Sequence, residues 1–308
     1  MTVTREPGAI TGVSAGGPSS SGATETPVAV PRRAVTVSID GNDVKVPEGA
    51  TILDACTANG TAVPTLCYGE TLDPVNACRV CVVEVENNRV LVPSCSRKVE
   101  TGMVVRTDTD RTRHSRKLVL ELLGSSVDLS TAPGVAGWMQ EYGADPSRFG
   151  ADSRTVRQPV KIDNDLYVRD YAKCILCYKC VDACGEQWQN TFAISVAGRG
   201  FDAQISTEFD VDLPESACVY CGNCIAVCPT GALMFKTEHD MRAADTWDES
   251  AQRQTDTICP YCGVGCTLTL HTQDNQIVKV TSPMDHSVTS GNLCIKGRFG
   301  FEHVHLGR

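Results

Sequence analysis

The sequence contains no apolar run of about 18 residues, the length that a membrane-spanning helix needs. Residues 1–33 also lack the apolar core of a secretory signal. Arg32 and Arg33 form a twin arginine, but the alternating residues from Ala34 onward are typical of a strand, so no twin-arginine export signal is expected. Basic residues are in deficit: 28 Lys and Arg against 37 Asp and Glu give a net charge of −9, which argues against nucleic acid as a partner. These absences favour a cytoplasmic chain without a membrane span.

Cysteine is the residue in excess. The chain has 17 cysteines among 308 residues, a length that suits two or three domains. Because thiols in the cytoplasm are kept reduced, this number indicates metal binding rather than disulfides. No cysteine occurs between Cys95 and Cys174, so the cysteines fall into separate groups along the chain.

Two cysteine runs share the spacing C-x2-C-x2-C-x3-C, at residues 174–184 and 218–228, and Pro229 follows the second. The pattern resembles a bacterial-type ferredoxin with two [4Fe–4S] clusters. The resemblance implies reciprocal ligation, in which three thiolates of one run share a cluster with the last thiolate of the other. One cluster is then expected on Cys174, Cys177, Cys180 and Cys228, and the other on Cys218, Cys221, Cys224 and Cys184. A pair of zinc knuckles is the alternative, because zinc also takes four thiolates.

The first cysteine group follows a β-rich segment. Apolar residues alternate on both sides of a turn at 40–43, which predicts a hairpin. Thr51 and Asp54 then open a helix that Asn59 and Gly60 close. A hairpin, a short helix and a cysteine-bearing loop resemble the β-grasp ferredoxin, which would hold a [2Fe–2S] cluster on Cys67, Cys78, Cys81 and Cys95.

The spacing of this group departs from the plant type. It resembles the variant in the large iron–sulfur subunit of complex I, in NAD-reducing hydrogenases and in NAD-dependent formate dehydrogenases. A zinc loop or free thiols are the alternatives. Cys56 has no place in any cluster and is expected to be a small buried core residue.

Residues 111–165 connect the two cysteine-rich regions. A basic stretch at 111–117 followed by an apolar one at 118–123 predicts a helix, with Gly124 after it. We expect the basic stretch, including His114, to be solvated surface rather than a partner contact or a ligand. Residues 125–165 are turn-rich, and Trp138 and Tyr142 are expected to pack together. The resembling families carry a further cluster here on one His and three Cys, which this chain lacks.

The last cysteine group has the spacing C-x2-C-x3-C-x27-C over residues 259–294. Short strands are predicted at 268–270 and 277–280, and a charged helical linker at 241–256. In isolation the pattern also fits a zinc ribbon. With the other groups it resembles the first domain of the molybdopterin oxidoreductases, particularly formate dehydrogenases. That resemblance implies a [4Fe–4S] cluster on Cys259, Cys262, Cys266 and Cys294, and it makes Lys296 a relay to the pterin; an ordinary surface lysine is the alternative.

The groups together resemble the N-terminal part of the catalytic subunit of NAD-dependent molybdenum or tungsten formate dehydrogenases. The resemblance implies one [2Fe–2S] and three [4Fe–4S] clusters that relay electrons between two partners. One is a catalytic subunit or domain with the molybdenum or tungsten bis-(molybdopterin guanine dinucleotide) cofactor, and the other a flavin- and NAD-binding subunit with further clusters. The formate-handling residues of the family are not in this chain, which is therefore expected to be a separate subunit or a fragment.

Three other functions remain open from the sequence. The large iron–sulfur subunit of NADH-quinone oxidoreductase shares the first group but usually keeps the His/Cys cluster. A multi-cluster ferredoxin-like carrier would not need the last group, and a hydrogenase diaphorase subunit would lack it.

The expected fold class is α+β with several domains. We predict a disordered tail at 1–33, a β-grasp [2Fe–2S] domain at 34–110, and a helix with a connecting segment at 111–165. A ferredoxin domain with two [4Fe–4S] clusters follows at 166–240, with a β-rich insertion at 190–209. The linker and the [4Fe–4S] domain that faces the molybdopterin then occupy 241–308.

Overall fold

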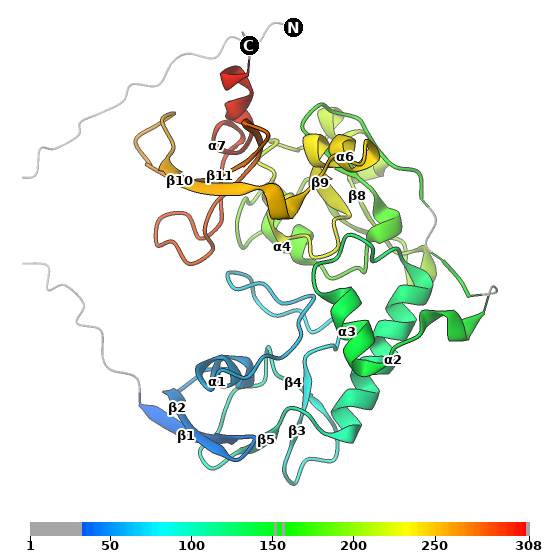
Figure 1. Cartoon of the computed structure of the whole chain (residues 1–308), viewed down its shortest axis with the longest axis vertical. Helices are drawn as coiled ribbons and strands as arrows, with labels where there is room; N and C mark the ends of the chain where they lie inside the picture. Colours follow the sequence, from blue (N-terminus) through cyan, green and yellow to red (C-terminus); the bar gives the residue numbers. More distant parts are fainter. Residues whose placement is uncertain (1–32, 151–152, 156–157, 306–308) are drawn as a thin grey trace, which may run out of the picture. The chain divides into compact units, whose positions relative to one another are not determined.

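The computed structural model describes residues 33–150, 153–155 and 158–305. Residues 34–308 form one contact unit, and residues 1–33 form another. All but the last residue of the predicted disordered tail lie outside the described residues. The described part has mixed α and β architecture (Figure 1).

The N-terminal domain is built on one five-stranded sheet with the order β2-β1-β5-β3-β4. The predicted hairpin is confirmed: strands β1 (Ala34–Ile39) and β2 (Asn42–Pro47) pair antiparallel. Thr51 is the N-cap of helix α1 (Ile52–Ala58), and its side chain forms the predicted capping box with Asp54. The remaining strands are β3 (Val82–Val85), β4 (Val92–Pro93) and β5 (Val104–Arg106), and β5 runs parallel to β1.

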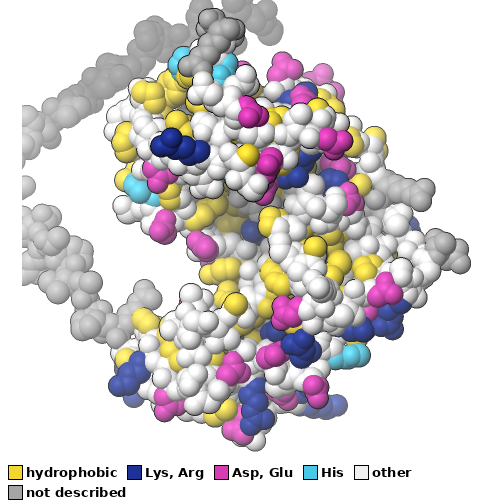
Figure 2. Space-filling view, viewed as in Figure 1, with side chains coloured by type: hydrophobic (Ala, Val, Ile, Leu, Met, Phe, Trp, Pro, Cys, Tyr) yellow, Lys and Arg dark blue, Asp and Glu magenta, His cyan; other side chains and the backbone are white. Residues whose placement is uncertain are grey.

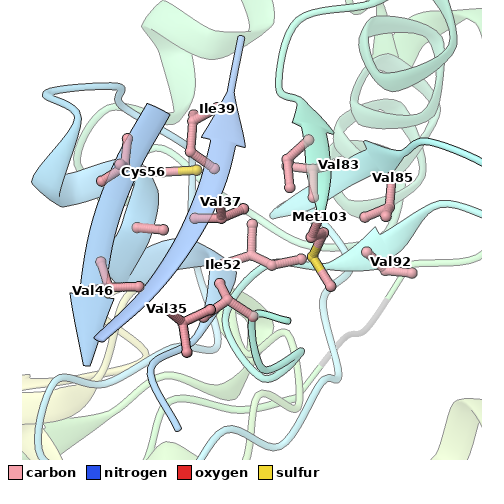
Figure 3. Packing of buried hydrophobic residues seen from close by; sticks show 14 residues of the cluster. Val35, Val37, Ile39, Val46, Ile52, Cys56, Val83, Val85, Val92 and Met103 are labelled. Carbon is pink, nitrogen blue, oxygen red and sulfur yellow. The ribbon is translucent and has the colours of Figure 1, made fainter. Parts of the chain in front are cut away.

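The core of this domain lies between α1 and the sheet. Figure 3 shows Val37, Ile39 and Ile52 facing Val83 and Met103 across it. Cys56 belongs to the same cluster and is fully buried, as its spacing predicted. Burial raises the pKa of its thiol to about 12, so Cys56 is a protonated core residue at neutral pH.

Helices α2 (Asp110–Ser126) and α3 (Val135–Tyr142) pack against each other after the sheet. Two expectations are wrong here. Gly124 lies inside α2 rather than after it. A Cβ at this position would meet Pro146 at 2.7 Å and Met139 at 2.9 Å, so the close packing there favours glycine. Arg116 is buried rather than solvated, since its guanidinium donates to the Val82 carbonyl at 3.0 Å and ties α2 to β3.

The middle domain contains the twin cysteine runs. Strands β6 (Tyr167–Arg169) and β9 (Leu233–Phe235) pair antiparallel, and each run ends in a short helix, α4 (Lys179–Cys184) or α5 (Asn223–Val227). The insertion between the runs contains β structure as predicted, and its strands β7 (Ser195–Ala197) and β8 (Gln204–Ser206) pair antiparallel. Helix α6 (Lys236–Ala243) follows β9 directly. Short 3-10 turns occupy Pro146–Phe149, Tyr171–Lys173, Gly200–Asp202, Glu208–Asp210, Leu213–Glu215, Glu249–Ala251 and Gly300–Val304.

The C-terminal domain is a three-stranded antiparallel sheet, β10-β11-β12, followed by helix α7 (Ile295–Phe299). Strands β11 (Thr267–Gln273) and β12 (Gln276–Thr281) confirm the two predicted there. The helical linker predicted at 241–256 is wrong for most of its length, because only residues 241–243 belong to an α-helix, the end of α6. Its last residues instead begin β10 (Arg253–Ile258), an edge strand in which every residue is exposed. An exposed edge strand has no apolar alternation to reveal it.

No helix in the described ranges is long and apolar enough to cross a bilayer. On the face shown in Figure 2, basic and acidic side chains are intermixed rather than gathered into patches of one sign. The surface charge of that face therefore adds no sign of a nucleic-acid site.

Candidate metal centres

The sequence predicts four sets of ligands among sixteen cysteines, and the sets are numbered 1 to 4. Set 1 comprises Cys67, Cys78, Cys81 and Cys95; set 2, Cys174, Cys177, Cys180 and Cys228; set 3, Cys184, Cys218, Cys221 and Cys224; and set 4, Cys259, Cys262, Cys266 and Cys294. None of the 16 is in a disulfide. As ligand sets, these groupings remain predictions.

Set 1 consists of two close pairs. The backbone N–H groups of Cys67 and Cys78 each donate to the other residue's Sγ at 3.5 Å. The Sγ atoms of Cys81 and Cys95 lie 3.5 Å apart. The loop at 67–81 brings the pairs together, because Cys81 immediately precedes β3 and Cys95 follows β4. Two thiol pairs are the donor set that two iron ions require.

Proximity changes the acidity of these thiols. A hydrogen bond from Cys67 lowers the pKa of Cys78 to about 5, and one from Cys95 lowers the pKa of Cys81 to about 6. The same two hydrogen bonds raise the pKa values of Cys67 and Cys95. Each pair thus gives up one proton readily and holds the other strongly, and a bound cation would displace both.

The twin runs have the same local backbone. Leu176 and Tyr178 in the first run, and Tyr220 and Gly222 in the second, all have positive φ. The turns aim N–H groups at sulfur: Leu176 donates to Cys174 Sγ and Tyr220 to Cys218 Sγ, each at 3.4 Å. Amide donors around a sulfur favour its thiolate form. Such a turn is therefore suited to a metal-bound thiolate.

The two runs exchange their last cysteines. Cys228, from the second run, lines a cavity with the first three cysteines of the first run. Cys184, from the first run, lines a second, mainly apolar cavity with the first three cysteines of the second. Four thiols around such a cavity are the donor set that a [4Fe–4S] cluster needs.

Hydroxyl groups lie close to three of these sulfurs. Tyr167, which is 2% exposed, has its Oη 3.1 Å from Cys218 Sγ. Burial and the nearby thiols raise the pKa of this phenol, so it stays a neutral donor. Thr191 Oγ1 lies 3.4 Å from Cys184 Sγ, and Thr230 Oγ1 lies 3.9 Å from Cys228 Sγ. Donors to sulfur are one of the means by which a protein sets the reduction potential of a cluster.

Set 4 is the most accessible. Cys259 is buried and Cys266 is half-buried, whereas Cys262 and Cys294 are exposed. The backbone N–H of Cys259 donates to the Cys266 carbonyl at 2.8 Å, which closes the loop between β10 and β11. Burial and the other three thiols of the set raise the pKa of Cys266. Lys296, two residues after Cys294, is exposed on α7.

Adjacent sets are in electrostatic contact. Lys179 is half-buried and is acted on by thiols of set 1 (Cys67, Cys78) and of set 2 (Cys177, Cys228). Cys180 of set 2 and Cys224 of set 3 also influence each other, and Arg298 interacts with thiols of sets 3 and 4. Packing agrees with the order 1, 2, 3, 4, because Cys78 shares a hydrophobic cluster with Ile175 of the first run, and Cys180 shares another with Cys224. Arg298 of α7 donates to the Cys221 carbonyl.

The sequence did not single out Lys179, Arg298 or Tyr167. Lys179 lies within a cysteine run and Arg298 just after the last cysteine, but no spacing pattern marks either side chain as buried. Their importance becomes visible only through contacts across the chain.

No site for a single metal ion is found within the described ranges. No group of three or more His, Cys, Asp or Glu side chains there is arranged so that it could hold one ion.

Three segments of the chain match known domain families. Residues 32–110 match the "2Fe-2S iron-sulfur cluster binding domain", residues 173–232 the "4Fe-4S dicluster domain", and residues 252–306 the "Molybdopterin oxidoreductase Fe4S4 domain". The chain therefore contains one 2Fe–2S domain and two domains of the 4Fe–4S type.

Curated relatives are similar over most of this chain. One of the NADH-quinone oxidoreductase subunits of Rhizobium meliloti is 34% identical over 278 residues, which cover 88% of this chain and 31% of the relative. A Staphylococcus haemolyticus protein, which its name assigns only provisionally as a formate dehydrogenase, is 28% identical over 306 residues, covering 87% of this chain and 31% of the relative. The chain thus spans about a third of the length of these relatives.

The fold is also similar to a solved one. A chain in the crystal structure of an NAD+-reducing [NiFe]-hydrogenase in the H2-reduced state aligns with a TM-score of 0.58 at 23% identity. The alignment covers 66% of this chain and 87% of that chain. At this identity the likeness concerns the fold alone.

Proposed function

We propose that this chain is the iron–sulfur electron relay of an NAD-dependent formate dehydrogenase. In this proposal, sets 2, 3 and 4 each hold a [4Fe–4S] cluster and set 1 holds a [2Fe–2S] cluster in a β-grasp domain. The close pairs of set 1 suggest that Cys67 and Cys78 bind one iron, and Cys81 and Cys95 the other. The bound clusters would supply one-electron transfer; the chain itself contributes the thiolates, the donors to sulfur and the burial.

The serial order of the sets is the observation that carries the proposal. An electron relay needs carriers that adjoin one another. Cys78 shares a hydrophobic cluster with Ile175, Cys180 shares another with Cys224, and Arg298 donates to the Cys221 carbonyl, which supports such a series. A storage or structural role would not require such an order. A relay joins two different partners, so its two ends should differ. Set 1 lies in the segment that matches a 2Fe–2S domain, and set 4 lies in the segment that matches a molybdopterin oxidoreductase Fe4S4 domain.

The exposed face of set 4 supports a molybdopterin-binding partner there. Cys262 and Cys294 are accessible, and apolar side chains around them are exposed: Ile258 by 62%, Val264 by 61% and Ile295 by 41%. Exposed apolar groups of this kind mark surfaces that another polypeptide covers. At the other end, set 1 would exchange electrons with a flavin- and NAD-binding subunit.

Formate as the substrate rests on the motif order and on the resemblance of residues 259–297 to formate dehydrogenases. A second candidate is the large iron–sulfur subunit of NADH-quinone oxidoreductase, and the 34% identity to the Rhizobium meliloti protein favours it. The absence of cysteine between Cys95 and Cys174 favours the first candidate. The two differ in what the assembled complex oxidises.

The proposal is tested by purifying the assembled complex anaerobically through a tag on this chain. We expect about 14 iron atoms on the chain, no stoichiometric zinc, and a molybdenum- or tungsten-containing partner. The complex should reduce NAD+ with formate. Zinc bound at one per chain would remove a cluster from the proposal, and a complex that oxidises NADH with quinone but leaves formate unchanged would establish the second candidate.

Lys296→Ala is expected to slow electron transfer from formate to NAD+ in this complex without changing its iron content. We expect slower transfer because Lys296 is an exposed cation two residues from Cys294 and can lie between set 4 and a cofactor in the partner. Lys45→Ala, an exposed lysine on β2, is the matched control and should leave the rate unchanged. Equal rates for the two variants would make Lys296 an ordinary surface residue.

A further inference from the structure

Arg298 is a fully buried cation at the junction of the middle and C-terminal domains. Its Nε donates to the Cys221 carbonyl at 2.9 Å, and its Nη2 donates to Asn223 Oδ1 at 3.0 Å. Further donations reach the carbonyls of Gly291, at 3.3 Å, and Val280, at 3.5 Å. All four acceptors are neutral, so the hydrogen bonds satisfy the guanidinium without neutralising it.

No carboxylate in the part of the chain that the structure describes pairs with Arg298. An arginine guanidinium stays protonated in proteins, so Arg298 is charged at neutral pH. A buried charge without an opposite charge is strongly unfavourable, which points to an anion that binds nearby.

The packing around Arg298 is tight enough to fix its position. A Cβ on Gly222 would come within 2.4 Å of Arg298 Cδ and 2.9 Å of Phe299 Cζ, so only glycine allows this approach. Asn223 Oδ1 also accepts from the Leu293 N–H at 3.1 Å, next to Cys294. Arg298 is thus held between set 3, through Cys221 and Asn223, and set 4.

We propose that Arg298 is the counter-ion of the two clusters on sets 3 and 4 and raises the reduction potentials of both. The inference rests on the proposed function, because it takes the clusters to be present. A cluster held by four thiolates is an anion, and the single electron that it accepts from a neighbouring carrier adds one negative charge, with no bond made and no proton moved. A fixed cation stabilises the reduced form more than the oxidised form. Arg298 is a positioning residue in this sense, since it touches no substrate.

The test is a redox titration of the cluster-loaded chain, with dithionite as the reductant and EPR as the readout. In Arg298→Met the charge is lost. In Asn223→Asp the shape is kept, but a carboxylate now faces the guanidinium and neutralises it. At the midpoint potential of each wild-type cluster, we expect the ratio of reduced to oxidised cluster on sets 3 and 4 to fall about tenfold in both variants. For a one-electron carrier this fall is equivalent to a 59 mV decrease in the reduction potential. Arg298→Lys keeps the charge and should restore most of the ratio.

The clusters on sets 1 and 2 are internal controls, and their ratios should not change. Should Arg298→Met fail to fold, Asn223→Asp still decides the question. An unchanged ratio in a fully loaded Asn223→Asp protein would overturn the role of Arg298, as would equal shifts of all four clusters. A failure of the proposed function looks different: the clusters would be missing, or the loaded complex would not oxidise formate.

Discussion

Cys228→Ala and Cys224→Ala, only four residues apart in one cysteine run, are expected to remove different clusters. Cys228 lines the cavity of set 2, whereas Cys224 lines that of set 3. Each variant should lose about four iron atoms per chain, because a cubane that lacks one of four thiolates is released or degraded. EPR of the reduced protein should show a different missing signal in each case.

The first run provides the mirror-image control. Cys184→Ala should remove the same signal as Cys224→Ala, and Cys180→Ala the same signal as Cys228→Ala. If each run instead held a cluster by itself, Cys228→Ala and Cys224→Ala would lose the same centre. Loss of the [2Fe–2S] signal in any of the four variants would contradict the separation of set 1 from sets 2 and 3.

Local patterns in the sequence predicted the elements whose determinants are local. The alternation on both sides of residues 40–43 predicted β1 and β2, and Thr51 with Asp54 predicted the start of α1. The cysteine runs also predicted which four cysteines line each of the two cavities of sets 2 and 3, because a short loop that wraps one face of a cluster leaves little freedom in spacing. These features require only residues close together along the chain.

Features that depend on distant packing were missed or wrong. Strand β10 has no buried residue, so its place in a sheet is decided by pairing with β11 alone. Gly124 lies within α2, and it is needed there because Pro146 and Met139 leave no room for a Cβ. Arg298 could not be distinguished from a surface arginine, since its partners Cys221 and Asn223 lie more than 70 residues earlier. Tertiary contacts override local propensity at each of these positions.

A second buried arginine near set 3 is neutralised, unlike Arg298. Arg169, on β6, lines the same cavity as Cys184 and Cys218. Its guanidinium forms an ion pair with Asp163, and the two side chains are 1% and 6% exposed. Burial raises the pKa of Asp163, but a hydrogen bond from the Leu213 N–H and the charge of Arg169 outweigh burial and lower it. Asp163 is therefore ionised at neutral pH.

Asp163→Asn is expected to lower the free energy of unfolding by about 3–5 kcal/mol, because it leaves the Arg169 charge buried without a partner. The substitution keeps the size of the side chain, so loss of charge rather than a cavity causes the effect. Circular dichroism during denaturant unfolding of the anaerobic, cluster-loaded chain measures it. The control is Asp202→Asn, which breaks the exposed ion pair with Arg154 and should change stability little. A similar decrease in the free energy of unfolding in both variants would show that the buried ion pair stabilises the fold no more than the exposed one.

The comparison between the two arginines also bears on the electron relay. Arg169 has its own carboxylate and needs no cluster to neutralise it, so the free energy of unfolding should fall in Asp163→Asn whether or not set 3 is loaded with iron. Arg298 has neutral acceptors only, and the free energy of unfolding should fall in Arg298→Met chiefly when sets 3 and 4 are loaded. Measuring both variants with and without clusters therefore separates an arginine that stabilises the fold from one whose charge is matched by the bound clusters. A fall in stability of equal size in loaded and cluster-free Arg298→Met would assign that residue to the fold as well.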